Sequence, residues 1–475
     1  MMTELYDLIT IVEGSVEADH KSVKVISPEV FRKNVERLIN ISSLEKNSRA
    51  AVARFLVRGA ALDLGIVPSS INDLYLARGK GEIPPTFTVP AINLRVLPFH
   101  AARVVLRIAN QINAGAIIFE IARSEIGYTD QRPSEYATNI LGAAIAEAYR
   151  GPIFIQGDHF QISAGRYADN PEMEVATVKE LTSEALHAGF YNIDVDTSTL
   201  VDLTKSTISA QQELNSTLSA ELTAFIRSIE PENITTSVGG EIGEVGGQNS
   251  TEEELRAYMD GYLEKLSALG SALPGLSKIS IQTGTSHGGV VLPDGSIAQV
   301  SVDFETLLNL SQVARMDYGM AGAVQHGAST LPQEAFGKFV EAEACEVHLA
   351  TNFQNIFFDE APKQLLSEMY SFLDKNNQNE RKPNMTDDQF YYKTRKRAIG
   401  EFKNQIINLS ETEKSKICQK WESQFNQLFS ALAIADTKKY VDTCITPVKV
   451  LPTLSSFIEM ITGTKEVEDT SDLAD

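Results

Sequence analysis

The chain has 475 residues, of which 43% are hydrophobic and 22% are charged. This balance is typical of a folded globular protein and excludes a largely disordered chain. The net charge of −21 disfavours a nucleic-acid-binding protein, because such proteins carry a basic surface. No apolar run of about 18 residues occurs, so we expect no transmembrane helix and no membrane partner.

Two further features indicate where the protein works. The first twenty residues carry acids where a secretory signal has basic residues, and their apolar run is too short for such a signal. The three cysteines, Cys345, Cys418 and Cys444, are too few and too scattered for a disulfide framework or a cysteine-based zinc site. We therefore expect a cytoplasmic protein.

The N-terminal part of the chain, residues 1–84, is predicted to be a mainly helical extension. It holds helical stretches such as residues 29–65.

The middle part, residues 85–360, alternates short β-rich runs with amphipathic helical stretches such as 98–115 and 171–189. Strict β–α alternation predicts a (β/α)8 TIM barrel. The alternative is an open doubly wound sheet, although no glycine-rich dinucleotide fingerprint follows the first strand. The eight predicted strands span residues 87–93, 116–122, 152–159, 191–197, 235–243, 278–288, 322–329 and 346–353.

The C-terminal part, residues 361–475, is rich in Lys, Glu, Gln and Asn and is predicted to be a second mainly helical extension. Trp421 lies on one helical face with Phe425 and Phe429, which are four residues apart. We expect this face to pack in a core rather than to anchor a partner.

Three of the seven histidines end predicted strands next to glycine or an acid. They are His159 in GDH (157–159), His287 in SHG (286–288) and His326 in HGAS (326–329). Barrel enzymes carry their catalytic groups at the carboxyl ends of the strands. Three imidazoles at this rim would suit a zinc ion with an open coordination position. The alternative is that each histidine is a separate polar loop residue.

With GGEIGEVGG at 239–247, these three motifs give the chain a resemblance to a known family. In this order and spacing they resemble the class II, zinc-dependent fructose-bisphosphate and tagatose-bisphosphate aldolases. The similarity covers roughly residues 85–355, so the two extensions indicate a long-form member.

The resemblance implies a role for each matching residue of the metal centre. Asp158 matches the catalytic acid/base that acts on the hydroxyl at the bond being broken. His159, His287 and His326 match the zinc ligands, and Glu241 matches a carboxylate that approaches the metal when the site is empty.

The resemblance also implies substrate contacts and a second ion. Backbone and hydroxyl donors hold the substrate phosphate and, in many members, a monovalent cation such as Na+ or K+. Asp196 matches an aspartate that orders the site. The matching substrate and phosphate contacts are Asn93, Gly288, Gly327, Ser329 and Thr351, with Asn352 as a partial replacement.

The chain departs from the family pattern in two places that bear on proton transfer and substrate. Gln248 and Asn249 stand where fructose-specific members carry acids, so the residue that abstracts the carbon-bound proton is unassigned. His348 and Ala350 stand where the family has an asparagine and an aspartate on the last strand.

A third departure concerns the second strand. Ala122 replaces a serine that contacts phosphate in the family, and the neighbouring Arg123 and Ser124 are candidate replacements, of which Arg123 is the stronger phosphate partner by charge. Glu120, in the middle of the same strand, points either into the barrel or outward to a helix; the pattern does not separate these.

We therefore expect a zinc-dependent lyase that acts on a phosphorylated ketose. The favoured reaction is reversible cleavage of a ketose 1,6-bisphosphate, foremost fructose 1,6-bisphosphate, to dihydroxyacetone phosphate and glyceraldehyde 3-phosphate. A zinc-dependent sugar or sugar-phosphate 4-epimerase and a non-catalytic aldolase-like subunit remain alternatives. The family implies a homo-oligomer, either a dimer or a tetramer.

Overall fold

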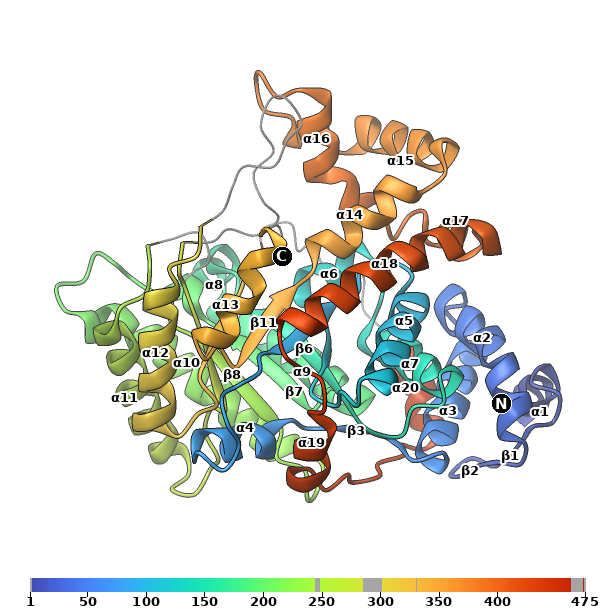
Figure 1. Ribbon diagram of the computed structural model, residues 1–475, viewed down its shortest axis with the longest axis horizontal. Coiled ribbons are helices and arrows are strands. Elements are labelled where there is room, and N and C mark those ends of the chain that lie inside the picture. Colours follow the sequence, from blue (N-terminus) through green and yellow to red (C-terminus); the bar gives the residue numbers. More distant parts are fainter. Residues whose placement is uncertain (1, 244–247, 285–300, 330, 463–472, 474–475) are drawn as a thin grey trace.

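The computed structural model describes residues 2–243, 248–284, 301–329, 331–462 and 473 (Figure 1). The predictions for His287 and Gly288 lie outside these described residues.

Eight parallel strands form a closed barrel. The hydrogen-bonded order runs from β4 through β11, β10, β9, β8 and β7, and a pairing of β7 with β6 closes the ring through β5. This confirms the predicted (β/α)8 barrel, and the open-sheet alternative is wrong. The strands are β4 (Val89–Asn93), β5 (Ile118–Ala122), β6 (Gly151–Gln161), β7 (Asn192–Asp196), β8 (Ser237–Glu241), β9 (Lys278–Ile281), β10 (Ala323–Gln325) and β11 (Glu346–Leu349).

Helices follow the strands and surround the barrel (Figure 1). Local signals set their ends: α11 begins with a capping box of Thr251 and Glu254, and Gly189 ends α9 in the left-handed region. The helices are α5 (Pro98–Gln111), α6 (Arg123–Tyr128), α7 (Pro133–Ala146), α8 (Ala164–Asp169), α9 (Pro171–Ala188), α10 (Ile208–Ile229), α11 (Glu252–Leu269), α12 (Phe304–Tyr318), α13 (Phe336–Glu341) and α14 (Thr351–Glu360).

The N-terminal part is mainly helical, as predicted, but it also holds three short strands. One of them, β3, extends the barrel sheet by pairing with the first residues of β6, from Ile66 opposite Gly151 to Ser69 opposite Phe154. Its four residues are too few to show a periodic pattern in the sequence. The elements are α1 (Met2–Ile11), β1 (Val16–Ala18), β2 (Val23–Val25), α2 (Pro28–Leu44), α3 (Ser48–Asp63), β3 (Ile66–Ser69) and α4 (Asn72–Gly79).

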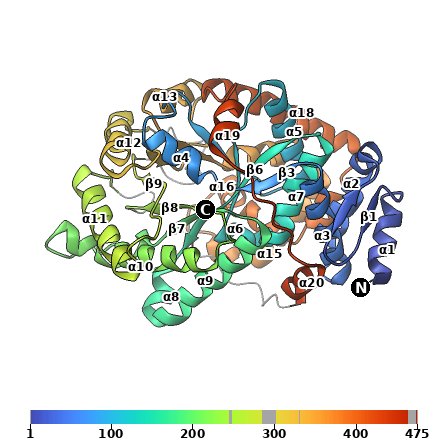
Figure 2. The same ribbon diagram turned by 90° about the horizontal axis from the view of Figure 1, so that it is seen from below.

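The C-terminal helices run from the carboxyl end of the barrel to its other end and then to the N-terminal part (Figures 1 and 2). Trp421 is fully buried and donates a hydrogen bond to the carbonyl of Phe353 at 3.0 Å, which confirms the predicted core packing. Phe457 packs edge-to-face on Phe55 of α3. These helices are α15 (Lys363–Asn376), α16 (Asp387–Thr394), α17 (Lys403–Ile407), α18 (Glu411–Ala431), α19 (Lys438–Cys444) and α20 (Leu454–Thr462).

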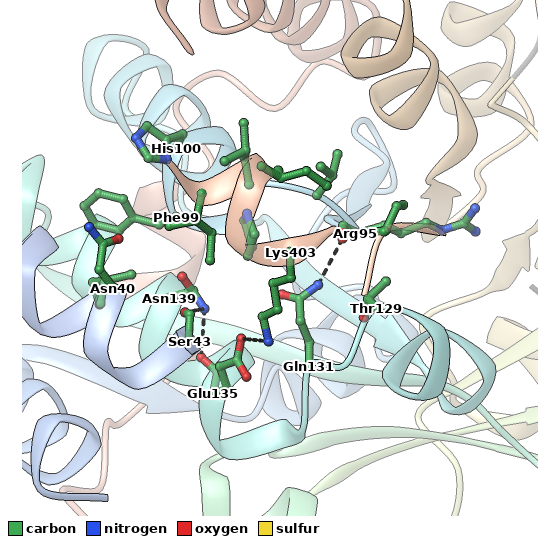
Figure 3. Close-up of a pocket in the computed structure, with 17 residues that line it drawn as sticks. Asn40, Ser43, Arg95, Phe99, His100, Thr129, Gln131, Glu135, Asn139 and Lys403 are labelled. Carbon is green, nitrogen blue, oxygen red and sulfur yellow. Dashed lines mark hydrogen bonds and ion pairs between the residues drawn. The ribbon is translucent and has the colours of Figure 1, made fainter. Parts of the chain in front are cut away.

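A pocket lies where α2, α5, α7 and α17 meet, between the barrel and both extensions (Figure 3). Lys403 reaches across it to Glu135, with Nζ 2.7 Å from Oε1. Its cavity of about 30 Å³ has room for about two water molecules, so it is too small for a sugar phosphate. Across the described residues, no helix combines the length and apolar character needed to cross a membrane.

Candidate active site

Two histidines and a glutamate meet inside the barrel at the carboxyl ends of its strands. His159 comes from β6, Glu241 ends β8 and His326 follows β10, and all three are buried. Nε2 of His159 lies 3.1 Å from Nδ1 of His326, and one donor atom from each residue lies within 4.8 Å of the others. Tetrahedral ligands about 2.0–2.1 Å from a zinc ion lie about 3.3 Å apart, so the two facing nitrogens have the spacing of zinc ligands.

A bulge in β6 brings His159 to the site beside Asp158. Successive residues of a regular strand point to opposite faces, whereas here both side chains are buried and approach to 3.8 Å. The register with β7 shifts between Gly157 and Phe160, and His159 has φ of +39°. A bulge of this kind re-aims a side chain next to a functional site.

The two imidazoles are held from behind by polar side chains. Nδ1 of His159 lies 3.0 Å from Oδ2 of Asp196 and 3.3 Å from Oε2 of Glu241, and Nε2 of His326 lies 3.0 Å from Oγ of Ser280. Such outer contacts fix the ring orientation and leave the other nitrogen of each ring for a metal. Asp196 thus occupies the ordering position that the sequence predicts for it.

Electrostatics at this cluster favour a cation. Burial opposes the charge of His159, but Asp158 and Glu241 outweigh it and raise the histidine pKa well above its usual range. Burial and the nearby Asp196 raise the pKa of Glu241 to about 7. A metal at this position would compete with the proton on His159, and its binding would release that proton.

Asp158, the predicted acid/base, faces a histidine of the last strand. Its Oδ1 lies 3.2 Å from Nδ1 of His348, which also lies 3.1 Å from Oε2 of Glu120. The His348 ring packs on His326, with ring centroids 4.0 Å apart. Glu120 therefore points into the barrel, which resolves the choice that the sequence left open.

Below the metal-binding cluster, the buried Lys278 of β9 joins inward-pointing side chains of β6, β7 and β11. Nζ of Lys278 lies 2.7 Å from Oε1 of Gln156, 2.9 Å from Oδ1 of Asp194 and 2.5 Å from Oε1 of Glu346. All four residues are buried. Barrels usually fill such layers with branched apolar residues, so a charged layer depends on this internal ion pairing.

Gly239 leaves space for the lysine layer. A Cβ on this residue would lie 2.3 Å from Oδ1 of Asp194 and 2.9 Å from Cε of Lys278. Packing therefore requires a glycine at the first position of the GGE motif, because a side chain there would clash with Asp194 and Lys278.

The predicted substrate residues lie at the same end of the barrel. Asn93 ends β4, where its Nδ2 donates to Oε2 of Glu125 at 2.6 Å. Its buried Oδ1 has no hydrogen-bond partner among the described residues. Arg123, the candidate phosphate partner, is already ion-paired with Glu174 at 2.7 Å.

The predicted phosphate-binding residues of the last two strands also lie together. Oγ of Ser329 accepts a hydrogen bond from the backbone N–H of Ala350 at 2.7 Å, next to Thr351 and Asn352 in the first turn of α14. Gly327 has φ of +68°, in the left-handed region that favours glycine.

Sequence reasoning missed most of the charged layer. Lys278 and Glu346 begin their strands, and a charged residue at the start of a buried strand was the available signal. Tyr75 of α4, whose hydroxyl donates to Glu346, gave no signal at all.

Comparison with known proteins places the chain in a family. The family model described as fructose-bisphosphate aldolase class-II matches residues 85–414. None of the curated proteins matches.

Solved structures resemble the chain at low identity. A protein of Sinorhizobium meliloti described as a probable tagatose 6 phosphate kinase has a TM-score of 0.50 and 13% identity, covering 79% of this chain and 97% of its own. The fructose-bisphosphate aldolase of Campylobacter jejuni has a TM-score of 0.42 and 15% identity, covering 78% and 96%. The YdjI aldolase of Escherichia coli K12 has a TM-score of 0.41 and 12% identity, covering 72% and 98%. The Sinorhizobium structure supports the fold and nothing finer.

Proposed function

The chain belongs to the class II fructose-bisphosphate aldolase family, and from this premise we propose that it is a zinc-dependent carbon–carbon lyase. Its substrate is a ketose 1,6-bisphosphate, foremost fructose 1,6-bisphosphate. The products are dihydroxyacetone phosphate and glyceraldehyde 3-phosphate, and the reaction is reversible.

The observation that carries the proposal is the meeting of a metal-binding donor set with a carboxylate. His159, Glu241 and His326 supply donors within 4.8 Å of one another, and Asp158 lies beside them. We assign His287 as a further zinc ligand from its motif alone. Zinc, when bound, is a Lewis acid that stabilises charge on a carbonyl oxygen.

The chain's own residues account for the proton of the cleavage step. As the C3–C4 bond breaks, its electron pair passes to C3 of the dihydroxyacetone phosphate half, which then takes up a proton, and the C4 hydroxyl proton passes to a carboxylate oxygen of Asp158. The C4 oxygen becomes the aldehyde of glyceraldehyde 3-phosphate. General-base help of this kind requires a carboxylate within hydrogen-bond reach of the hydroxyl.

The substrate phosphate and a monovalent cation, Na+ or K+, are assigned to the rim of the last strands. Gly327 and Ser329 lie there, and Ser329 is hydrogen-bonded to the turn that starts α14. Gly288 joins them by motif, while Asn93, Thr351 and Asn352 complete the set of substrate contacts. A homo-oligomer follows from the family as part of the same proposal.

The experiment is an assay of fructose 1,6-bisphosphate cleavage by purified protein, with and without a chelator. We expect cleavage that stops with chelator and returns with zinc. Asp158→Asn should retain zinc and lose activity, because the amide cannot accept the proton. Cleavage that persists in the chelated protein, or in Asp158→Asn, would contradict the proposal.

A second candidate is a sugar-phosphate 4-epimerase that uses the same retro-aldol chemistry. One observation favours it: His348 and Ala350 replace family residues that contact substrate, and His348 lies against Asp158. Zinc-loaded protein that releases no triose phosphate but interconverts C4 epimers of a ketose phosphate would establish this candidate in place of the lyase.

A further inference from the structure

The N-terminal extension reaches into the barrel from the end opposite the candidate active site. Helix α4 lies below the strands, whereas α14, α15 and α16 lie above them (Figure 1). Tyr75 of α4 is buried, and its hydroxyl donates a hydrogen bond to Oε2 of Glu346 on β11. Burial and the neighbouring Glu346 raise the tyrosine pKa well above its usual range, so the hydroxyl keeps its proton.

Tyr75 completes the hydrogen bonding of the Glu346 carboxylate. The other oxygen, Oε1, lies 2.5 Å from Nζ of Lys278, 2.9 Å from Nε2 of Gln156 and 2.7 Å from Nε2 of His348. A buried carboxylate with donors on both oxygens is fixed in rotation, because any turn breaks charge-assisted bonds. The Tyr75 hydroxyl is the partner that the described residues give to Oε2.

Glu346 in turn sets the ring of His348. With Nε2 held by Glu346, Nδ1 of His348 lies between two carboxylates, 3.2 Å from Oδ1 of Asp158 and 3.1 Å from Oε2 of Glu120. A continuous series of contacts therefore joins α4 of the extension to the side chain assigned as acid/base. No member of this series except Asp158 is assigned a substrate contact.

A metal ion in the same place is the competing interpretation. Glu120, Glu346 and His348 have donor atoms within 4.8 Å of one another, as a metal site would. However, the ammonium of Lys278 lies 2.5 Å from Glu346 and already supplies the cation there. Glu120, Glu346 and His348 therefore form an internal ion-pair network with Lys278, and this network orients the side chains that contact it.

We propose that Tyr75 is a positioning residue for Asp158, acting through Glu346 and His348, so that the N-terminal extension is part of the catalytic unit. The inference rests on the proposed function for the role of Asp158. The Tyr75 hydroxyl, on the side of the barrel opposite the candidate active site, then affects the rate of cleavage without affecting substrate affinity.

The first test is Tyr75→Phe in the full-length, zinc-loaded protein. The loss of one hydrogen bond to a buried charged group should lower kcat about tenfold, with KM and zinc content unchanged. Tyr262→Phe is the matched control, because Tyr262 is buried and its hydroxyl donates to Thr223 between α10 and α11. An equal loss of kcat in Tyr262→Phe, or a change confined to KM, would overturn the inference.

The second test separates transmission through His348 from a general effect on the fold. In a His348→Asn background, Tyr75→Phe should lower kcat less than twofold further, because the transmitting ring is absent. A full tenfold loss in that background would refute the route through His348.

A third measurement does not depend on activity. The ring ¹⁵N resonances of His348, identified by their loss in His348→Asn, should shift in Tyr75→Phe and stay in place in Tyr262→Phe. If the wild-type protein cleaves no ketose bisphosphate but the shift occurs, the proposed function fails while the positioning series stands. If the His348 resonances do not move in Tyr75→Phe, the positioning role is wrong whatever the activity.

Discussion

Nζ of Lys278 lies 2.5 Å from Oε1 of Glu346 in the middle of the barrel, where both side chains are buried. The two residues start strands β9 and β11, which are separated in the sheet by β10. Their ion pair therefore crosses the barrel interior. Asp194 of β7 also pairs with Lys278, with its Oδ1 2.9 Å from Nζ. The strands are joined through their charged side chains as well as through the backbone.

Lys278→Met should destabilise the fold strongly. Glu346 and Asp194 would remain buried without their cation, and removing one partner of a buried ion pair costs about 3–5 kcal/mol. We expect a loss of this size in the free energy of unfolding, measured by urea denaturation at constant zinc.

The matched control for this prediction is Lys265→Met. Lys265 pairs with Glu213 at the surface, where both side chains are substantially exposed. Exposed pairs contribute about 0–1 kcal/mol, so this variant should unfold close to wild type. Equal losses in the two variants would show that the buried lysine has no special role.

Asp196→Asn should weaken zinc binding without removing a ligand. Asp196 orients the His159 ring at 3.0 Å, and loss of such a contact typically costs about 10–100-fold in metal affinity. Competition with a chromogenic chelator would measure the change. Asp202→Asn is the control, because Asp202 is half-buried and its side chain contacts Thr204 and Lys205 of its own turn. Unchanged affinity in Asp196→Asn would argue against His159 as a ligand.

Gly239→Ala should disturb the ion pair of Asp194 and Lys278 by crowding. A Cβ would lie 2.3 Å from Oδ1 of Asp194, and overpacking of this kind costs about 1–3 kcal/mol. Gly337→Ala is the control, since a Cβ there meets nothing within 4 Å on helix α13. Thermal unfolding should separate the two variants, and a Gly239→Ala protein as stable as Gly337→Ala would count against the crowding.

The barrel could be predicted from the sequence because each strand is a short, buried run between amphipathic helices. All eight strands lie within the predicted ranges or overlap them closely, as with 151–161 against the predicted 152–159. Their order also predicted that His159 and His326 would meet, since the strand ends of a closed barrel face one centre. The division of the chain at residues 84 and 360 stays a prediction.

Other features depend on register and on distant contacts, which one sequence does not display. The bulge that re-aims His159 arises from a shift in the pairing of β6 with β7. Tyr75 and Glu346 are 271 positions apart, and neither belongs to a motif. Even Lys278 was visible only as the first residue of a strand, without its partners.

Glu120 and Glu346 belong to one buried network, yet their carboxyl groups titrate in opposite directions. Burial and the nearby Asp158 raise the pKa of Glu120 to about 8. Burial also opposes the charge of Glu346, but Lys278 and His348 overcome it and lower that pKa to about 2. The ordinary value for both groups is 4.5.

These opposite shifts predict different pH dependences of stability. Between pH 4.5 and about 8 the folded state retains a proton on Glu120 that the unfolded chain releases. The contribution of this proton to the free energy of unfolding is therefore full below pH 4.5 and is lost as the pH rises through about 8. Glu120→Gln does not titrate, and its stability relative to wild type should rise between pH 5 and 8 by at most about 1.4 kcal/mol per pH unit. Glu346 is ionised in both states over that window, so Glu346→Gln should differ from wild type by a constant. Urea unfolding of the three zinc-loaded proteins at pH 5, 6, 7 and 8 would test this, and parallel curves for Glu120→Gln and wild type would show that Glu120 is ionised in the fold.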